Sequence, residues 1–416
     1  MEETIKEAEK VVIAGVHTDA LNSLSDTTEE SMRELNELVE TAGGIVVGEM
    51  VQNRHVIETG TYFGEGKLTE LKNACETLDA SMVVVDDELT GAQIRNIEEA
   101  LGGITVIDRN TLILDIFAQR AKSAEGKIQV ALAQMKYMLP RLSGMGNQLS
   151  RQGGGIGTRG PGEKKLEMDR RLIRERISRL KKELKDVERH RELIRGQRKQ
   201  SGLKVAALVG YTSAGKSSIE NALTQAGVLE DAMLFSTLDT TTRALTLDNT
   251  QEILLTDTVG FINKLPHHLV EAFKSTLEEA KYADIIVHVV DASNPQMDAQ
   301  MHVVYETLRQ LGAEGKPVIT LFNKQDKVEI PVNHKDLQAD YSIATSAKTG
   351  QGLEEFKHAL LEIIRKEQIY IERLYDFSEA GKIQLIRSKG QLLSEEYVPE
   401  GIEVKAYVPQ DIYGRL

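Results

Sequence analysis

The residues best suited to chemistry form a glycine-rich segment, GYTSAGKS, at residues 210–217. It follows the apolar run VAALV and precedes the helical pattern SIENAL, the strand–loop–helix context of a phosphate-binding loop. The glycines let successive backbone N–H groups point at phosphate oxygens, and the helix N-terminus adds partial positive charge. Lys216 is expected to reach the β- and γ-phosphates, and the Ser217 hydroxyl suits Mg²⁺.

A second motif, ILLTDTVG, follows at residues 253–260. Asp257 stands at the end of a predicted strand, where it is expected to hold the Mg²⁺ shell through a water. The Gly260 N–H can bond the γ-phosphate, and the absence of a side chain permits rotation when that phosphate leaves. The motif is common by itself and becomes informative only at this distance after a phosphate loop.

A third motif, PVITLFNKQD at residues 317–326, selects the base. Asp326 can accept both the N1–H and the exocyclic amine of guanine, whereas adenine would leave a buried Asp326 unpaired. Asn323 and Lys324 are expected to brace the phosphate loop and cover the base. The backbone of residues 346–348, within TSAKTGQG, can bond the guanine carbonyl. The order and spacing of these motifs predict a G domain that hydrolyses GTP.

The rest of the chain must position these motifs. Alternating apolar runs and helical patterns predict an α/β fold: an N-terminal α/β domain with a long helical hairpin, a G domain with a mostly parallel sheet, and a small C-terminal α/β domain. The predicted boundaries are 1–140, 141–203, 204–367 and 368–416. In the first domain, strands are expected at 11–16, 45–52, 82–86 and 104–107, and helices at 31–41, 66–78, 91–101 and 111–139, the last ending at Pro140.

The charge of the chain is unevenly distributed. The net charge is −13, yet residues 141–200 contain 18 Lys and Arg against 8 Asp and Glu, which leaves −23 for the remainder. A nucleic-acid or membrane contact explains this asymmetry, and so does a solvated helix rich in salt bridges. A glycine-rich loop at 151–167 contains GIGTRG, but no strand precedes it, so a dinucleotide site is not predicted. Its cations, beginning at Arg151, suit phosphate contact, with a linker as the alternative.

Composition excludes several protein classes. The chain has a single cysteine, and 41% of its residues are hydrophobic, which indicates a globular protein without internal disulfides. No apolar run approaches the length of a membrane span, and the acidic N-terminus is no signal peptide. We therefore expect a soluble, cytoplasmic protein.

Three further stretches resemble the HflX family of translation-factor-related GTPases. These are RGPGEKKLEMDRR at 159–171, FSTLDTTTR at 235–243 and TYFGEGKL at 61–68. The resemblance covers nearly the whole chain. It implies binding to the large (50S) ribosomal subunit, with members that split stalled or idle ribosomes. It also favours an rRNA contact through the region between Arg151 and Lys199, and we expect a monomer.

The motifs and the resemblance together give a predicted guanine-nucleotide site. Its residues are Gly210, Tyr211, Thr212, Ser213, Ala214, Gly215, Lys216, Ser217, Phe235, Ser236, Thr237, Leu238, Asp239, Asp257, Thr258, Val259, Gly260, Asn323, Lys324, Gln325, Asp326, Ser346, Ala347 and Lys348.

Catalytic roles within this site are predicted for Lys216, Thr237 and Gly260. The resemblance implies Ser217 and Thr237 as Mg²⁺ ligands, although the adjacent threonines at 240–242 could replace Thr237.

Two departures from the usual GTPase pattern matter. Phe261 stands where many GTPases place a glutamine that orients water, so slow hydrolysis without a ribosomal activator is expected. Ser213 stands where relatives often carry an asparagine that supports a monovalent-cation site, so potassium stimulation is not predicted.

The predicted function is therefore a GTP-hydrolysing switch on the large ribosomal subunit that splits or rescues ribosomes. One alternative is a signalling or scaffold GTPase with a protein partner. Another is an ATP-dependent RNA remodeller, although the chain has no second phosphate-loop motif.

Overall fold

The chain packs into two compact units. The computed structural model describes residues 8–18, 28–142, 161–201, 203–224, 234–235, 241–247, 251–264, 274–328 and 334–416. The first unit contains residues 1–188 with the described parts of 231–239 and 262–275, and the second contains 189–230, 240–261 and 276–416. Two short segments close in sequence to the nucleotide motifs therefore pack with the N-terminal part of the chain.

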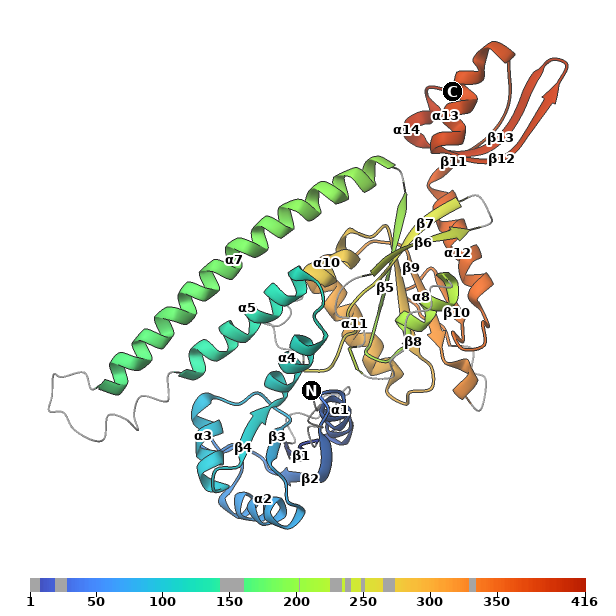
Figure 1. The fold of residues 1–416 in the computed structure, drawn as a ribbon. Helices are drawn as coiled ribbons and strands as arrows, with labels where there is room; N and C mark the ends of the chain where they lie inside the picture. Colours follow the sequence, from blue (N-terminus) through green and yellow to red (C-terminus); the bar gives the residue numbers. More distant parts are fainter. Residues whose placement is uncertain are drawn as a thin grey trace, which may run out of the picture. The chain divides into compact units, whose positions relative to one another are not determined.

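A four-stranded parallel sheet of order β2-β1-β3-β4 forms the centre of the first unit (Figure 1). Its strands are β1 (Lys10–His17), β2 (Ile45–Asn53), β3 (Met82–Val85) and β4 (Thr105–Asp108), and its helices are α1 (Thr28–Thr41), α2 (Glu65–Leu78) and α3 (Gly91–Ala100). Consecutive residues of β1 are buried, as in a parallel strand covered on both faces. The predicted parallel α/β arrangement is confirmed.

The single helix expected over residues 111–139 is wrong. The structure has two helices, α4 (Arg109–Arg120) and α5 (Ala124–Arg141), separated by Ala121 in an extended conformation with ψ of 112°. The Ser123 hydroxyl accepts a hydrogen bond from the Gly126 N–H at 2.9 Å, so it caps a new helix that the apolar periodicity concealed. Pro140 lies inside the last turn of α5 instead of just beyond it. The lack of an N–H removes only one hydrogen bond there.

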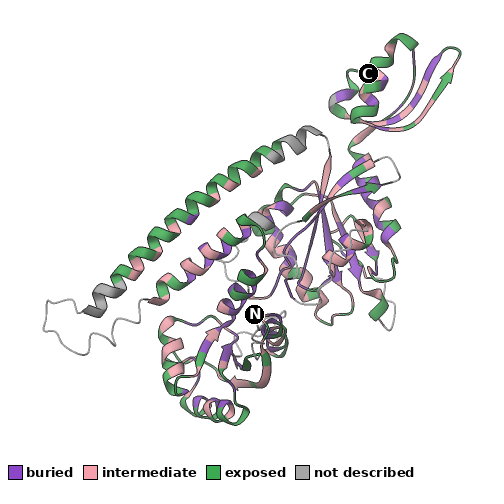
Figure 2. Cartoon of the chain, in the orientation of Figure 1, coloured by how far each residue is buried: buried purple, intermediate pink, exposed green. Residues whose placement is uncertain are grey.

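The basic segment forms one long helix, α7 (Pro161–Ser201), which runs in the opposite direction to α5 (Figure 1). Most of its described side chains are exposed (Figure 2). Leu180 is 4% exposed, whereas Leu172 is 53% exposed, so the leucines of this helix are not all buried. Within the described part of the chain, no helix combines the length and apolar character needed to cross a membrane.

The second unit contains a six-stranded sheet of order β10-β9-β8-β5-β7-β6, parallel except for the β6–β7 pair. Its strands are β5 (Lys204–Gly210), β6 (Thr241–Leu247), β7 (Gln251–Asp257), β8 (Ile285–Asp291), β9 (Val318–Asn323) and β10 (Tyr341–Ala344). Its helices are α8 (Lys216–Thr224), α10 (Lys274–Tyr282), α11 (Met297–Leu311), η4 (Gln325–Lys327) and α12 (Leu353–Lys366).

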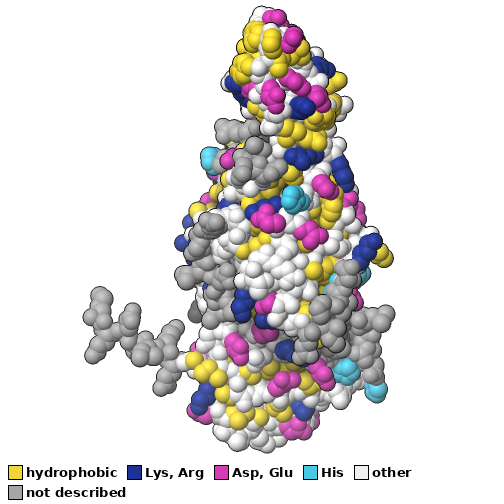
Figure 3. Space-filling model, turned by 90° about the vertical axis from the view of Figure 1, so that its right-hand side faces the viewer, with side chains coloured by type: hydrophobic (Ala, Val, Ile, Leu, Met, Phe, Trp, Pro, Cys, Tyr) yellow, Lys and Arg dark blue, Asp and Glu magenta, His cyan; other side chains and the backbone are white. Residues whose placement is uncertain are grey.

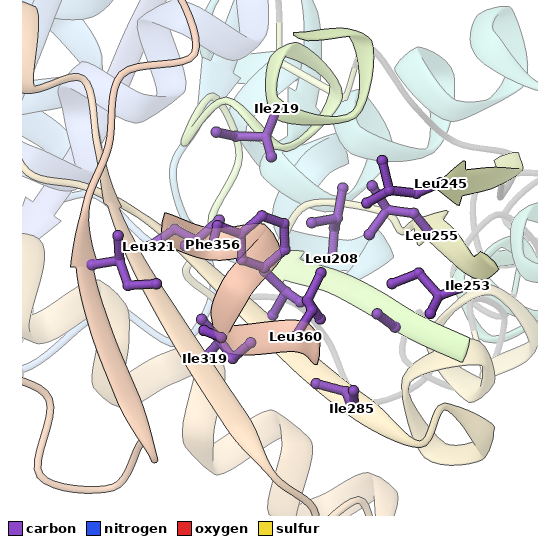
Figure 4. Close-up of a cluster of buried hydrophobic side chains, with 14 of the residues drawn as sticks. Leu208, Ile219, Leu245, Ile253, Leu255, Ile285, Ile319, Leu321, Phe356 and Leu360 are labelled. Atoms are coloured by element: carbon purple, nitrogen blue, oxygen red, sulfur yellow. The ribbon is translucent and has the colours of Figure 1, made fainter. Parts of the chain in front are cut away.

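One core of this sheet is mostly aliphatic and includes Leu208 and Leu255, together with Phe356 of α12 (Figure 4). Because the parallel strands share one direction, their carboxyl ends lie along one edge, where the loops carrying the motifs emerge. The predicted mostly parallel sheet is confirmed.

The chain ends in a small antiparallel sheet of order β11-β13-β12 with helices on one face. Its elements are β11 (Gln368–Tyr375), η5 (Phe377–Glu379), α13 (Ala380–Lys389), β12 (Gln391–Val398), β13 (Gly401–Pro409) and α14 (Gln410–Tyr413). Ile371, Val404 and Ile383 form part of its core. Tyr370 and Leu374 are about half exposed, and hydrophobic side chains are visible on this part of the surface, at the top of Figure 3.

A buried histidine stands within the six-stranded sheet. His288 of β8 is 1% exposed, and its ring lies edge-on to Tyr305 at 5.1 Å between centroids. Among the described residues, its Nδ1 has no hydrogen-bond partner. Burial lowers the pKa of His288 to about 4, opposed by Asp336 and assisted by Lys216. The ring is therefore neutral in the folded protein at neutral pH.

Replacing His288 with leucine should reduce the sensitivity of the fold to acid. The pKa of His288 lies near 4 in the folded chain and near 6.5 when unfolded, so its contribution is complete above pH 6.5 and is lost as the pH falls toward 4. Between pH 7.5 and 5, wild type should lose ~2 kcal/mol of unfolding free energy relative to His288→Leu, as measured by urea unfolding. Exposed His358 supplies the control, His358→Leu. Equal acid sensitivity of wild type and His288→Leu would contradict the prediction.

Candidate functional site

The phosphate-loop motif forms the turn between β5 and α8. Gly210 has φ of +155°, and a Cβ there would lie 2.2 Å from the carbonyl oxygen of Val289 on β8. Gly215 has φ of +97°, and its Cβ would lie 2.3 Å from Asn323 Nδ2. Both positions therefore require glycine, because a side chain would collide with the neighbouring strands.

Lys216 folds back into the loop that it follows. Its Nζ donates to the carbonyl oxygens of Gly210 at 3.1 Å and Tyr211 at 2.9 Å. The residue is 7% exposed. Burial lowers the pKa of Lys216 to about 8, partly offset by the charge of Asp257. An anion inside the loop would compensate the buried charge, which is what a phosphate group would do.

Ser217 and Asp257 place two oxygen atoms beside this lysine. Ser217 Oγ donates to Asp257 Oδ2 at 2.7 Å. The two residues meet because β7 pairs with β5, with Asp257 opposite Leu208. A hydroxyl and a carboxylate at the mouth of a phosphate loop are hard ligands of the kind that Mg²⁺ prefers, so the donor set fits this ion.

The end of the DTVG motif packs against the phosphate loop. A Cβ on Gly260 would lie 2.9 Å from Thr212 Cα and 3.0 Å from Lys216 Nζ. The next residue is fixed by two backbone bonds, Phe261 N–H to Gly210 O at 3.1 Å and Thr212 N–H to Phe261 O at 2.8 Å. The Phe261 side chain is buried, so it supplies neither polarity nor a hydrogen bond to an attacking water.

Asn323 connects two loops of the site. Its Nδ2 donates to Ala214 O at 2.9 Å, and its Oδ1 accepts from the Ala347 N–H at 3.0 Å. The phosphate loop and the loop at 346–348 are thereby held by one buried side chain. The Ala347 N–H, which sequence reasoning assigned to the guanine carbonyl, is engaged with Asn323 in this structure.

Lys324 and Asp326 follow at the end of β9. Lys324 has φ of +64°, and its Nζ pairs with Asp291 Oδ2 at 2.6 Å. Asp326 Oδ1 accepts from Ser346 Oγ at 2.7 Å, and this hydrogen bond lowers the pKa of the carboxyl. The sequence argument assumed a buried Asp326, whereas the structure has it exposed. The loop leaves the carboxylate at the surface, and a bound base would have to supply the burial.

The remaining predicted residues differ in placement. Gln325 begins η4 and donates from Nε2 to Phe322 O at 3.1 Å. Thr258 Oγ1 donates to Leu208 O at 2.7 Å, which supports the strands instead of facing a ligand. Ser236, Thr237, Leu238 and Asp239 lie outside the described residues, so the structure gives no placement for the predicted Mg²⁺ ligand Thr237.

Two residues that flank the motifs belong to the first compact unit. Phe235 is 3% exposed and packs edge-on against Phe117, with ring centroids 4.5 Å apart. Its assignment to the nucleotide site remains a prediction. Lys264, three residues after Phe261, pairs through Nζ with Asp86 Oδ2 at 2.6 Å and Asp87 Oδ1 at 3.1 Å. Sequence reasoning found neither contact, because both join positions more than a hundred residues apart.

Sequence reasoning also missed Glu220 and Asp291. The sequence places Glu220 only within a helical pattern, although the residue is 2% exposed. Asp291 ends a buried parallel strand, a position where functional side chains gather, so the apolar run before it could have drawn attention to this residue. The described residues contain no cluster of three or more His, Cys, Asp or Glu suited to a metal ion.

Three family models match consecutive parts of the chain. Their descriptions are GTP-binding GTPase N-terminal, GTP-binding GTPase Middle Region and 50S ribosome-binding GTPase, and they match residues 29–118, 120–198 and 205–324. The third match includes the phosphate loop, the DTVG motif and the first two residues of the NKQD motif.

Curated relatives match over almost the full length. The chain is 57% identical to GTPase HflX of Lacrimispora saccharolytica, covering 98% of this chain and 95% of the relative. It is 47% identical to that of Caldanaerobacter subterraneus (100% and 95%) and 38% identical to that of Escherichia coli (93% and 88%). A crystal structure of a GTP-binding protein from Sulfolobus solfataricus in complex with GDP is 26% identical, with a TM-score of 0.45 and coverage of 85% and 99%.

Replacing Asp326 with alanine should remove discrimination between guanine and hypoxanthine. Hypoxanthine lacks the exocyclic amine, so wild type should bind GDP about tenfold more tightly than inosine diphosphate, the effect of one lost hydrogen bond to a charged group. Asp326→Ala should weaken GDP binding and bring the two affinities together, as measured by calorimetry. Asp298→Ala on α11 is the matched control. A preserved tenfold ratio in Asp326→Ala would rule out this role for Asp326.

Proposed function

This chain belongs to the HflX family of GTPases, and on that premise we propose that it is a guanine-nucleotide switch that splits or rescues ribosomes through the large subunit. The chain is a GTP-hydrolysing enzyme whose G domain matches the ribosome-binding GTPase model. The observation that carries the ribosomal part is the cationic exposed surface of α7.

The nucleotide part of the proposal rests on the phosphate loop and its neighbours. Lys216 and the loop N–H groups hold the β- and γ-phosphates, and Asp326 binds the guanine edge. Ser217 and Thr237 are the proposed Mg²⁺ ligands, with Asp257 acting through a water. When bound, Mg²⁺ would neutralise negative charge on the phosphate groups during hydrolysis.

Switching follows from contacts that only the γ-phosphate can make. The Gly260 N–H and Thr237 respond to this phosphate, so hydrolysis releases the segments that contain them. Gly260 already packs against Thr212 and Lys216 in the described structure, and its position beside the phosphate loop supports this role.

The described part of α7 provides the proposed rRNA contact. Its exposed cations are Arg171, Arg174, Arg176, Arg179, Lys181, Lys182, Lys185 and Arg189. Within the helix, Arg171 pairs with Glu175 at 3.7 Å, and because both side chains are exposed this pair competes only weakly with a phosphate. Cations of this density suit a phosphate backbone, in a chain whose net charge is otherwise acidic. We assign the protein to the cytoplasm, where ribosomes are found. We also propose that it acts as a monomer.

Binding to large ribosomal subunits should require the GTP state and should weaken steeply with salt. We expect co-sedimentation with isolated large subunits in a non-hydrolysable GTP analogue, and loss of binding in GDP or at higher salt. Changing Arg176, Lys181 and Lys185 to glutamate should abolish binding and leave GTP hydrolysis by the free protein intact. Lys335→Glu with Lys382→Glu and Lys389→Glu on α13 makes the same change of charge outside α7 and is the control. Salt-insensitive binding would instead favour a protein contact, and absence of binding in any state would favour a different partner.

Hydrolysis by the isolated protein should be slow and should rise when large subunits are added. The physical reason is Phe261, whose buried apolar side chain cannot orient the attacking water. Single-turnover hydrolysis of GTP with and without large subunits measures the effect. Equal rates in both conditions would show that the chain completes its own catalytic site.

A further inference from the structure

Asp291 is the last residue of β8, and none of the nucleotide motifs includes it. It lies opposite Asn323 in the parallel β8–β9 register, and the Ala292 N–H donates to Asn323 O at 2.9 Å. Asp291 therefore lies beside the start of the NKQD motif, at the carboxyl edge of the sheet, where ligand-facing side chains gather. Its side chain is 15% exposed, so most of the carboxylate is shielded from water.

The two carboxylate oxygens of Asp291 have different partners. Oδ1 accepts hydrogen bonds from the Ser293 N–H at 3.0 Å and from Ser293 Oγ at 2.6 Å. Oδ2 pairs with Lys324 Nζ at 2.6 Å. The local turn through Ser293 fixes the direction of the carboxylate, because an aspartate that bonds the backbone two residues on has few other rotamers available. Asp291 is therefore a fixed point to which Lys324 is attached.

Lys324 has a backbone conformation that lysine rarely adopts. Its φ is +64° and its ψ is +32°, in the left-handed region that favours glycine. Residues in this region persist where the surrounding contacts fix them, and they cluster where ligands are held. The preceding residue, Asn323, bonds the phosphate loop at Ala214 O, and the N–H of the following residue donates to Thr345 O at 3.1 Å. Lys324 is thus fixed at both neighbours and at Nζ.

The pair between Asp291 and Lys324 contributes little to the stability of the fold. Both side chains are partly exposed, at 15% and 23%, and ion pairs that water can reach are weak. The pair matters more for the lysine itself. A free lysine side chain samples many rotamers and loses that freedom when a ligand packs against it, whereas a tethered lysine has less freedom to lose. The pair is therefore suited to preparing Lys324 for a ligand.

We propose that Asp291 is a positioning residue of the guanine-nucleotide site, which holds Lys324 so that the aliphatic stem of this lysine covers one face of the base. The proposal rests on the proposed nucleotide function, and it goes further by assigning a residue that touches no part of the nucleotide. Because Nζ is engaged with Asp291, the apolar stem is the part of Lys324 left for a purine ring. The contact then involves the base, which GDP and GTP share.

The first test measures nucleotide affinity in the full-length chain carrying Asp291→Asn. Asparagine keeps an oxygen acceptor for Ser293 but loses the charge that holds Lys324. GDP and the β,γ-imido analogue of GTP should both weaken about fivefold, the effect of immobilising one lysine side chain. Calorimetry with Mg²⁺ measures both affinities. Asp298→Asn on α11 makes the same change of charge outside the site and should alter neither affinity. Unchanged binding by Asp291→Asn would overturn the proposal.

A double-mutant cycle with Lys324→Met tests whether Asp291 acts through the lysine. Methionine keeps an apolar stem but cannot pair with Asp291, so Lys324→Met should show about the same loss as Asp291→Asn. The double variant should lose no more affinity than either single variant, and additive losses would contradict the proposal. If Asp291→Asn does not fold, Lys324→Met still decides the outcome, because wild-type GDP affinity in that variant would show that the tether has no effect.

Two further measurements separate positioning from general damage to the loop. The preference of about tenfold for GDP over inosine diphosphate depends on Asp326 and should be retained in Asp291→Asn. The single-turnover rate at saturating GTP should be unchanged, while the GTP concentration that gives half of this rate should rise about fivefold, because the contact is the same in the ground and transition states. Loss of the base preference, or a lower rate at saturation, would mean that Asp291 supports the whole loop and would refute a positioning role.

Failure of the proposed function gives a different result. Wild type that binds neither GDP nor the analogue would refute the nucleotide site itself. Wild type that binds both nucleotides, with Asp291→Asn and Lys324→Met variants that bind them as tightly, would refute only the role of Asp291.

Discussion

A close approach of two backbones constrains the whole nucleotide site. The Cα of Gly210 lies so near the carbonyl of Val289 that no side chain fits between them, and Gly215 is equally close to Asn323. A loop that must present its N–H groups to an anion has to curl tightly. At these two positions it can do so only with glycine, because the neighbouring strands leave no room for a side chain. The Asn323 side chain then fixes the loop through Ala214. Other parts of the site are arranged around this fixed loop.

The parallel sheet explains how distant residues reach the same place. Asn323 and Ala214 are 109 positions apart, yet β9, β8 and β5 are neighbours, and their carboxyl ends share an edge. Asp257 arrives on β7 from the opposite side of β5. This arrangement places acidic, amide and hydroxyl groups around one loop without requiring them to be close in sequence. It also leaves the ligand-facing residues on loops, while the strands supply rigidity.

Buried carboxylates and their partly buried partners occur where segments meet. Lys264 is held by Asp86 and Asp87, and Glu220 by Thr241 and Arg243. Burial by itself raises the pKa of Asp86, but Arg109 and Lys264 reverse that effect and hold it below its ordinary value. Removing one member of such a group leaves the others buried and uncompensated, so these pairs fix the chain at defined positions.

The sequence by itself determined the motifs, the α/β class and the parallel sheets, because glycine requirements and apolar periodicity are local properties. Tertiary structure decided the rest. Ser123 divides a continuous apolar pattern into two helices, and only its capping hydrogen bond reveals the break. Asp326 is exposed, although its role suggested burial. The partners of Phe235 and Glu220 could not be predicted. Packing and ion pairing depend on which strands and helices become neighbours, and local sequence patterns do not show this.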